Sequence, residues 1–228
     1  MQSLKSKAIE FLKHLPVFEP LDETDRIQLA SQVKMEVIEK HQHIYHIDDF
    51  SDKVFFLVKG IVKIGTTSAD GREVIKQILH PMSMFGELGL MGELKRQDFA
   101  IAMNKPVTVF TIRTAQLKNF LQTNHQLSMK FLQLIGSRLR EAETRLESMI
   151  FKDARERIID FLKDSANRQG KRIGFEMLIK HCLTQQDIAN ITGTSRQTVT
   201  SVLNELKKSN LIYFNRRSIL IRDMARLH

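Results

Sequence analysis

The sequence predicts an α+β protein: a β-rich N-terminal unit, one long helix, and a C-terminal helix-turn-helix with a two-stranded wing. Three observations support this class. Short alternating apolar runs fill residues 35–112, a coiled-coil spacing extends over residues 132–149, and two short helices separated by a glycine occupy residues 183–211. We therefore divide the chain into residues 1–115, 116–150 and 151–228.

Composition narrows the class of protein. The chain has 228 residues, of which 42% are hydrophobic, so it can bury a sizeable core. No run approaches the roughly 18 apolar residues of a membrane helix, and the charged N-terminus is unlike a signal peptide. We therefore expect a cytoplasmic protein that does not bind membranes. The single cysteine, Cys182, permits no intrachain disulfide and no cysteine-ligated iron–sulfur cluster.

Positive charge is concentrated near the C-terminus. The formal net charge is +9, and residues 151–228 contain 15 Lys or Arg against 8 Asp or Glu. This excess is typical of an element that displaces counterions from DNA phosphates. A basic surface that is merely solvated would have the same composition, so charge alone does not decide between the two.

The N-terminal half of the sequence predicts helices that pack on the fold, followed by a β-sandwich or barrel. Residues 1–30 have helical apolar spacing, with Asp22 as the N-cap of a second helix. From Met35 to Ile112, short alternating runs are separated by turn signals, and Asp70-Gly71 is a strong hairpin signal.

One segment of the β unit, Phe85 to Gly92, breaks the alternation with three glycines in eight residues. Its backbone N–H groups could approach a ligand, and Glu87 could accept hydrogen bonds from hydroxyl groups. The alternative is that the glycines form turns and that Glu87 only ties down the loop.

A long helix is predicted from the Thr123-Asn124 break to about Ile150. Apolar residues recur along it at alternating spacings of three and four, which is the pattern of a coiled-coil seam. No second heptad helix is present in the chain, so the seam predicts a homodimer rather than an intrachain bundle. Phe131, Leu134 and Arg138 flank it and would pack on the β unit. The predicted seam consists of Leu132, Ile135, Leu139, Ala142, Leu146 and Met149.

The C-terminal part begins with a helix from Asp153 to near Ser165. An irregular segment between Gly170 and Gly174 and a strand over Phe175–Ile179 should follow. Beyond the helix-turn-helix, residues 211–221 read as strand, turn and strand, a wing with Arg216 and Arg217 at its tip, placed to touch phosphate.

The helix-turn-helix is predicted from its caps and its corner. Thr184 should cap the first helix, with Asp187 at the capping-box position, and Gly193 supplies the corner. Thr194 or Ser195 should cap the second helix, whose first polar residues would face base edges in the major groove. A helical hairpin with polar residues facing water is the alternative. The predicted DNA contacts are Thr184, Gln185, Thr194, Ser195, Arg196, Gln197, Thr198, Ser201, Arg216 and Arg217.

The order of these parts resembles the cAMP-receptor and fumarate/nitrate-regulator superfamily of bacterial transcription factors. The residues that carry the resemblance are Val58-Lys59-Gly60, Phe85 to Leu90, Phe151 with Asp153, and Gly193-x-Ser195-Arg196-x-Thr198-Val199. The resemblance implies a cyclic-nucleotide-binding-like β jelly roll, a two-fold dimer and binding to palindromic promoter sites in double-stranded DNA. It also allows RNA polymerase as a further partner.

Departures from the cAMP-binding branch predict that cAMP is not the effector. That branch holds the cyclic phosphate with an Arg-Ser pair, which matches Gln97 and Asp98 here, with Arg96 one place early; it receives adenine on a Thr-Ser pair, matched here by Ala142 and Glu143. The cysteines of the oxygen-sensing branch and the Cys or His of the haem-sensing branch are absent. We therefore name no cofactor. The protein either binds DNA without an effector or binds another small molecule. The predicted effector-binding residues are Gly86, Glu87, Leu88, Gly89, Arg96, Gln97, Asp98, Ala142 and Glu143.

Departures in the second helix predict an altered half-site. Arg196 matches the guanine-reading arginine of the family, whereas Gln197 stands where the family often has Glu. Ser201 replaces a second arginine of the cAMP branch. Its side chain is shorter, so we expect it to contribute less to the recognition of bases.

Two other classes of function compete with a regulator. The first is a metal-dependent cupin-type enzyme with a fused DNA-binding domain, motivated by His41, His43 and Asp48. The second is a ligand-binding module without DNA function, which the C-terminal domain disfavours. We expect neither enzymatic activity nor a metal site.

Overall fold

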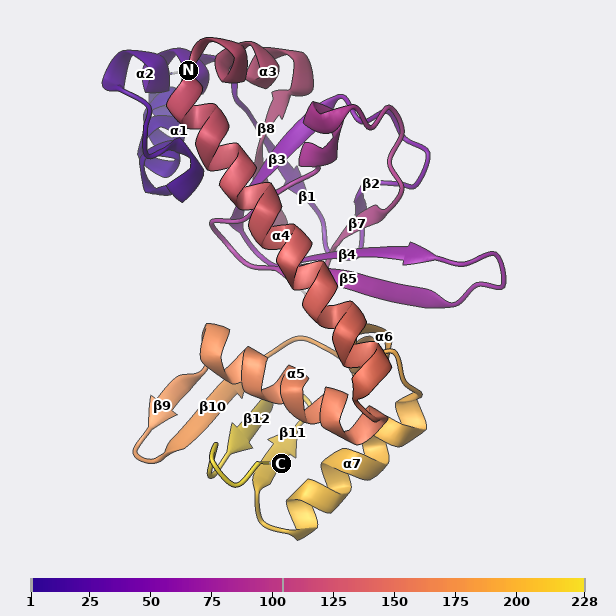
Figure 1. The fold of residues 1–228 in the computed structure, drawn as a ribbon. Coiled ribbons are helices and arrows are strands. Elements are labelled where there is room, and N and C mark those ends of the chain that lie inside the picture. Colours follow the sequence, from indigo (N-terminus) through magenta and orange to yellow (C-terminus); the bar gives the residue numbers. More distant parts are fainter. Residues whose placement is uncertain (1, 104, 228) are drawn as a thin grey trace. The chain divides into compact units, whose positions relative to one another are not determined.

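A computed structural model describes residues 2–103 and 105–227 (Figure 1). The chain divides into two units inside its long helix α4 (His125–Phe151), after Arg140. The first unit contains the helices and β-strands that precede α4, together with α4 as far as Arg140. The second contains residues 141–228, with residues 73–75 grouped to it.

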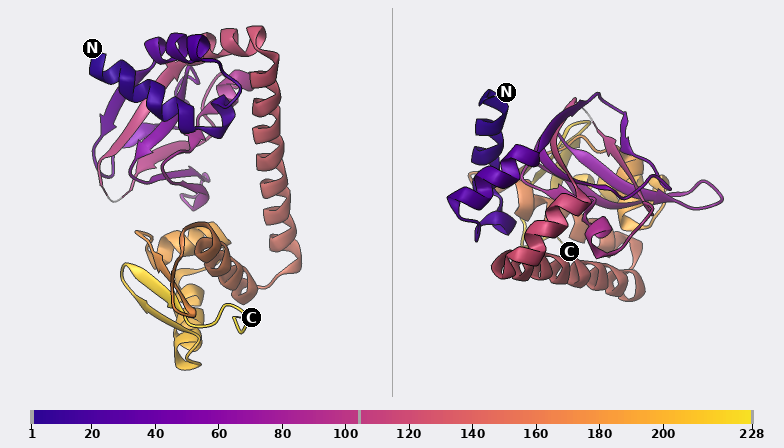
Figure 2. Two further views of the ribbon diagram at one scale, coloured as in Figure 1. Left: turned by 90° about the vertical axis from the view of Figure 1, so that its left-hand side faces the viewer. Right: turned by 90° about the horizontal axis from the view of Figure 1, so that it is seen from above.

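Helices cover one end of the β-strands in the first unit (Figure 2). Asp22 caps its helix as predicted, because its carboxylate accepts a hydrogen bond from the Asp25 N–H at 2.7 Å. Phe18 is fully buried and packs edge-on against Phe56, with ring centroids 5.3 Å apart. The helices of this region are α1 (Gln2–His14), η1 (Pro16–Phe18), α2 (Glu23–Gln32) and α3 (Thr114–Thr123).

The strands of the first unit form two four-stranded sheets, ordered β1-β8-β3-β6 and β2-β7-β4-β5. This arrangement confirms the predicted β-sandwich. The Asp70-Gly71 turn joins β4 to β5, and the Gly71 N–H donates to the Ser68 carbonyl at 2.9 Å. The strands are β1 (Lys34–Ile38), β2 (His43–Tyr45), β3 (Lys53–Lys59), β4 (Val62–Thr67), β5 (Glu73–Leu79), β6 (Met84–Phe85), β7 (Phe99–Ala102) and β8 (Val107–Arg113).

Aromatic rings fill part of the interior between these sheets. Phe55 and Phe85 stack with centroids 5.1 Å apart, and the ring of Tyr45 lies 5.6 Å from that of Phe55. All three residues are buried in one apolar cluster with Leu57 and Val109. The interior of the jelly roll is therefore occupied by the protein's own side chains at this point.

Helix α4 presents two different faces along its length. Leu127 and Phe131 are buried in the core of the first unit, as expected for the flank that packs on the strands. Leu132, Leu139 and Leu146 instead remain about 60% exposed, at 59%, 60% and 62%. One face thus belongs to the core, while the leucine face has no cover in the single chain.

The second unit combines three helices with one four-stranded sheet, ordered β11-β12-β10-β9. The predicted wing is confirmed, since the last two strands pair as a hairpin. The elements are α5 (Ala154–Gln169), β9 (Lys171–Ile173), β10 (Glu176–Lys180), α6 (Gln185–Thr192), α7 (Arg196–Lys208), β11 (Ile212–Asn215) and β12 (Ser218–Ile221).

Two local predictions in this unit are wrong. Helix α5 ends at Gln169 rather than near Ser165, because the buried Ala166 gives the helix one more turn of core contact. The segment between Gly170 and Gly174 is a strand, β9, which pairs with β10. Gly174, with a φ of 60°, forms the corner of this hairpin.

Acidification should destabilise the second unit through His181. This residue lines a small cavity with Phe161, Ile179 and Ile188, and burial lowers the pKa of its imidazole. The unfolded chain therefore binds the proton more readily, so stability is fully present above about pH 6.5 and is lost as pH falls toward the lower folded pKa. The midpoint of thermal unfolding of His181→Leu should fall less between pH 7.5 and pH 5.5 than that of the wild type.

His125→Gln is the matched control, because His125 is exposed at the start of α4. It should keep the wild-type dependence on pH. An equal loss of stability in His181→Leu and in the wild type would contradict the role of His181.

Candidate nucleic-acid interface and effector region

The first helix of the helix-turn-helix is fixed by a capping box. The Thr184 hydroxyl accepts the Asp187 N–H at 3.0 Å, and the Asp187 carboxylate accepts the Thr184 N–H at 2.8 Å. At the other end of the helix, Gly193 adopts a φ of 62°. A Cβ at this position would be strained and would come within 3.2 Å of the terminal carbon of Met149. Both the predicted cap and the predicted corner are confirmed.

The second helix, α7, begins after Ser195, whose hydroxyl accepts the Thr198 N–H at 3.0 Å. Ser195 rather than Thr194 is therefore the cap. One side of α7 is buried in the core of the unit, so the polar residues of its first turns point away from the core. The buried residues are Val199, Val202, Leu203 and Leu206.

Most predicted DNA contacts on the two helices are accessible. Thr184, Ser195, Arg196, Gln197 and Ser201 are exposed, and the others are half-buried: Gln185, Thr194 and Thr198.

A hydrogen bond connects the starts of the two helices. The Thr200 hydroxyl lies 2.7 Å from the side-chain oxygen of Gln185 and 2.9 Å from the Arg196 carbonyl. The N-terminal turns of α6 and α7 thus lie side by side, which brings their predicted contacts together on one edge.

The wing presents two arginines at a tight turn. The Asn215 side-chain oxygen accepts the N–H groups of Arg217 at 2.9 Å and of Ser218 at 3.0 Å. Arg216 and Arg217 are exposed. The ammonium group of Lys207, on α7, lies 5.4 Å from the ring centroid of Tyr213 and so connects the wing to the second helix.

Arg157 positions the helix-turn-helix, a role that no pattern in the sequence indicates. Its guanidinium donates to the carbonyls of Thr192 at 2.8 Å, Gly193 at 3.2 Å and Lys152 at 2.7 Å. One side chain therefore connects the corner of the helix-turn-helix to the end of α4. Asp153, next to Lys152, caps α5 through a capping box with Glu156.

The glycine-rich segment of the jelly roll forms the short helix η2 (Glu87–Met91). Gly86 has a φ of 72°, which favours glycine. A Cβ at Gly89 would lie 2.2 Å from the Ser51 carbonyl oxygen, so the close approach at this glycine is to the chain itself. Leu88 is exposed, whereas Glu87 is only 3% exposed.

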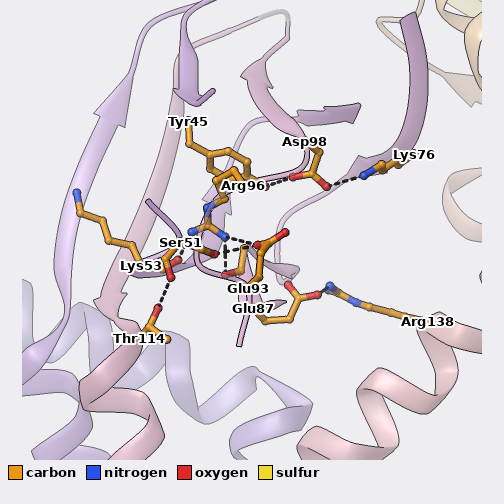
Figure 3. Close-up of polar contacts among 11 residues, drawn as sticks. Tyr45, Ser51, Lys53, Lys76, Glu87, Glu93, Arg96, Asp98, Thr114 and Arg138 are labelled. Carbon is orange, nitrogen blue, oxygen red and sulfur yellow. Dashed lines mark hydrogen bonds and ion pairs between the residues drawn. The ribbon is translucent and has the colours of Figure 1, made fainter. Parts of the chain in front are cut away.

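Arg96 lies inside the jelly roll and is only 2% exposed (Figure 3). Its Nη1 donates to the Gly86 carbonyl at 2.8 Å and its Nη2 donates to the Lys53 carbonyl. The guanidinium carbon lies 4.5 Å from the ring centroid of Tyr45, and Glu93 forms an ion pair with Arg96 at 3.8 Å. The side chain is therefore engaged by protein groups on several sides.

Asp98 shares the partner Tyr45 with Arg96 and also contacts Lys76 (Figure 3). It accepts hydrogen bonds from the Tyr45 hydroxyl at 3.2 Å and from Lys76 Nζ at 3.2 Å. Burial, together with the charge of Asp98, raises the pKa of Tyr45 far above its ordinary value, so its hydroxyl stays a donor. Gln97 is exposed between them. Arg96 and Asp98 therefore meet at Tyr45, whereas Gln97 is exposed and does not join them.

Glu87 forms an ion pair with Arg138 of α4, which also donates to the Met84 carbonyl. The predicted flanking role of Arg138 is thus confirmed, and the Glu87 carboxylate is occupied by a cation rather than directed at an open space. Ala142 and Glu143 lie about one turn further along α4 and are exposed.

The metal-site hypothesis gains no support. His41 lies in the turn before β2 with a φ of 65°, so it does not share a strand face with His43, whose ring instead stacks on His46 at 4.0 Å. Among the described residues, no three His, Cys, Asp or Glu side chains lie close enough to hold a metal ion. Within the same stretches, no helix has the length and apolarity that crossing a bilayer requires.

Comparisons with known proteins agree with both parts of the fold. Residues 35–124 match the family model of the cyclic nucleotide-binding domain, and residues 156–228 match that of the Crp-like helix-turn-helix domain. The chain is 28% identical over 218 residues to a CRP-like cAMP-activated global transcriptional regulator of Mycobacterium tuberculosis, with 96% of this chain and 97% of the relative covered.

Two further matches also cover most of the chain. A global nitrogen regulator of Nostoc is 29% identical over 189 residues, with 82% of this chain and 84% of the relative covered. The structure of FixK2 from Bradyrhizobium japonicum matches with a TM-score of 0.75 at 25% identity, over 86% of this chain and 96% of that one. The relative from Mycobacterium tuberculosis is named as a cAMP-activated transcriptional regulator and that from Nostoc as a nitrogen regulator, so the names do not agree on an effector.

Replacing Arg96 should destabilise the jelly roll. Arg96→Ala leaves the carbonyls of Gly86 and Lys53 buried without their donor, which should lower the free energy of unfolding by about 3 kcal/mol. Chemical denaturation measures this loss. The exposed Arg113→Ala variant should lose well under half as much. Equal stability of Arg96→Ala and the wild type would show that the guanidinium does not hold this loop.

Proposed function

This chain belongs to the cAMP-receptor and fumarate/nitrate-regulator superfamily, and we propose that it regulates transcription as a homodimer that reads palindromic DNA without cAMP. The observation that carries the proposal is the geometry of α7. Its apolar residues are committed to the core, and Arg196 and Gln197 extend from its capped first turn.

Sequence is read by the first residues of α7. Arg196 offers paired donors to the two acceptors of guanine, and Gln197 offers one donor and one acceptor, the pattern that adenine presents. The preferred half-site should differ from that of relatives with a glutamate at the position of Gln197. Arg216 and Arg217 of the wing contact phosphate, which adds affinity and fixes register but reads no bases.

Two copies of the chain pair along α4. The exposed leucines of the seam provide the apolar surface, and their heptad spacing matches a two-stranded coiled coil. Such a dimer presents two α7 helices about one helical turn of DNA apart, which is why the target site should be palindromic. RNA polymerase is a further partner in this proposal, since the family resemblance implies binding to promoter sites.

The groups that would hold cAMP are occupied by the chain itself. Arg96 is bound to the carbonyls of Gly86 and Lys53, and Asp98 is bound to Tyr45 and Lys76. Glu87 is paired with Arg138. A ligand with a cyclic phosphate would have to break these contacts and face the Asp98 carboxylate. These contacts support either a protein that binds DNA without an effector or an effector of different chemistry.

An effector would act through the junction between α4 and α5. It can shift the equilibrium between two states of the dimer only to the extent that it binds one state more tightly than the other. The junction at Phe151–Asp153 is where such a shift would reach the DNA-binding unit, since Arg157 connects Lys152 directly to the corner of the helix-turn-helix.

Removing the Arg196 guanidinium should weaken specific DNA binding. Against a duplex selected from a random-sequence pool, Arg196→Ala should lose about 1–3 kcal/mol of binding free energy and relax preference at one base pair per half-site. Fluorescence anisotropy at moderate salt measures both effects. Lys208→Ala, exposed in the last turn of α7, is the control and should keep the base preference. Equal binding of selected and random duplexes by the wild type would refute sequence reading.

Adding cAMP should change neither binding nor stability. We expect no heat of binding in calorimetry at millimolar cAMP and no change in affinity for the selected duplex, because the phosphate contacts are already used within the chain. A cAMP-dependent relative measured in parallel shows that the assay responds. A saturable heat, or tighter DNA binding with cAMP, would contradict this part of the proposal.

A further inference from the structure

The heptad pattern of α4 assigns a position to each of its charged residues. Leu132, Leu139 and Leu146 occupy the a positions, so Arg138 falls at g and Glu143 at e. In a parallel two-stranded coiled coil, a g residue lies opposite the e residue five places further along the partner helix. Arg138 of one copy and Glu143 of the other therefore face each other.

Arg138 is already oriented for such a contact. Glu87 and the Met84 carbonyl hold its guanidinium against the first unit. The side chain is 22% exposed, so part of it remains accessible. The first unit thus fixes this cation beside the seam instead of leaving it to move in solvent.

Glu143 lies on the complementary edge of the seam. It is exposed, and its carboxylate makes no ion pair or hydrogen bond with the described residues. It cannot reach Arg138 of its own chain face to face, because residues five apart on a helix point about 140° away from each other. Its charge and its heptad position both fit a cation from a second helix.

We propose that Arg138 forms an ion pair with the partner's Glu143, which sets the parallel register of the dimer and connects Glu87 of one copy to α4 of the other. This inference rests on the proposed homodimer. The resulting row of three charges, Glu87, Arg138 and the partner's Glu143, occurs twice in each dimer. Any change at Glu87 then reaches the partner helix directly.

Exchange of charge between two chains tests the pair. Chains with Arg138→Glu repel one another at both contacts, and so do chains with Glu143→Arg, whereas a mixed dimer has two attractive contacts. With one chain tagged, native mass spectrometry should find about three quarters or more mixed dimers, against half for random pairing. Both chains carry Glu87→Gln, so that the new carboxylate at position 138 does not face a second one.

The control uses the same charge changes on the outer face of α4. Arg140→Glu and Glu147→Arg occupy b positions, which do not face the partner, and both residues are exposed. Mixing these chains, again with Glu87→Gln, should give random pairing. Dimers that pair randomly in the Arg138–Glu143 mixture would overturn the ion pair and leave the homodimer intact. A wild-type chain that stays monomeric would overturn the homodimer itself.

Discussion

Helix α4 has to bury two faces, and a single chain can bury only one of them. Phe131 is 2% exposed in the core of the first unit, whereas Leu139 is 60% exposed. Full burial of a leucine side chain contributes about 1.5–3 kcal/mol, so a partner helix on this face has a substantial driving force. The proposed spacing of the recognition helices and the proposed contact at Arg138 both depend on that second burial.

In the jelly roll, the chain's own residues occupy the segment where the sequence predicted a ligand. The glycines of the Phe85–Gly92 segment suggested a cradle for a ligand, yet Gly89 is needed for close approach to Ser51. Arg96 supplies a cation inside the roll, and its partners are carbonyls and an aromatic ring. Glycine allows the backbone to approach any atom, so the sequence alone cannot distinguish a ligand from a neighbouring strand.

The sequence predicted features that depend on neighbours a few residues away. The caps at Thr184 and Ser195 and the corner at Gly193 are local, and all three are present. Strands such as β6, with two residues, are shorter than one full alternation and leave no pattern to detect. The roles of Arg96 and Arg157 could not be predicted, because their carbonyl partners lie up to 43 and 36 residues away in the chain.

The contacts of Arg157 restrict how a signal could reach the DNA-binding helices. Its guanidinium bonds to the last turn of α4 through Lys152 and to the corner of the helix-turn-helix through Thr192 and Gly193. The side chain of Met149 comes close to the same corner. A movement at the end of α4 is therefore transmitted to the corner of the helix-turn-helix, and the hydrogen bond from the Thr200 hydroxyl to Gln185 joins α7 to α6. Regulation would then change the distance and angle between the two recognition helices of a dimer, while each helix-turn-helix keeps its internal geometry.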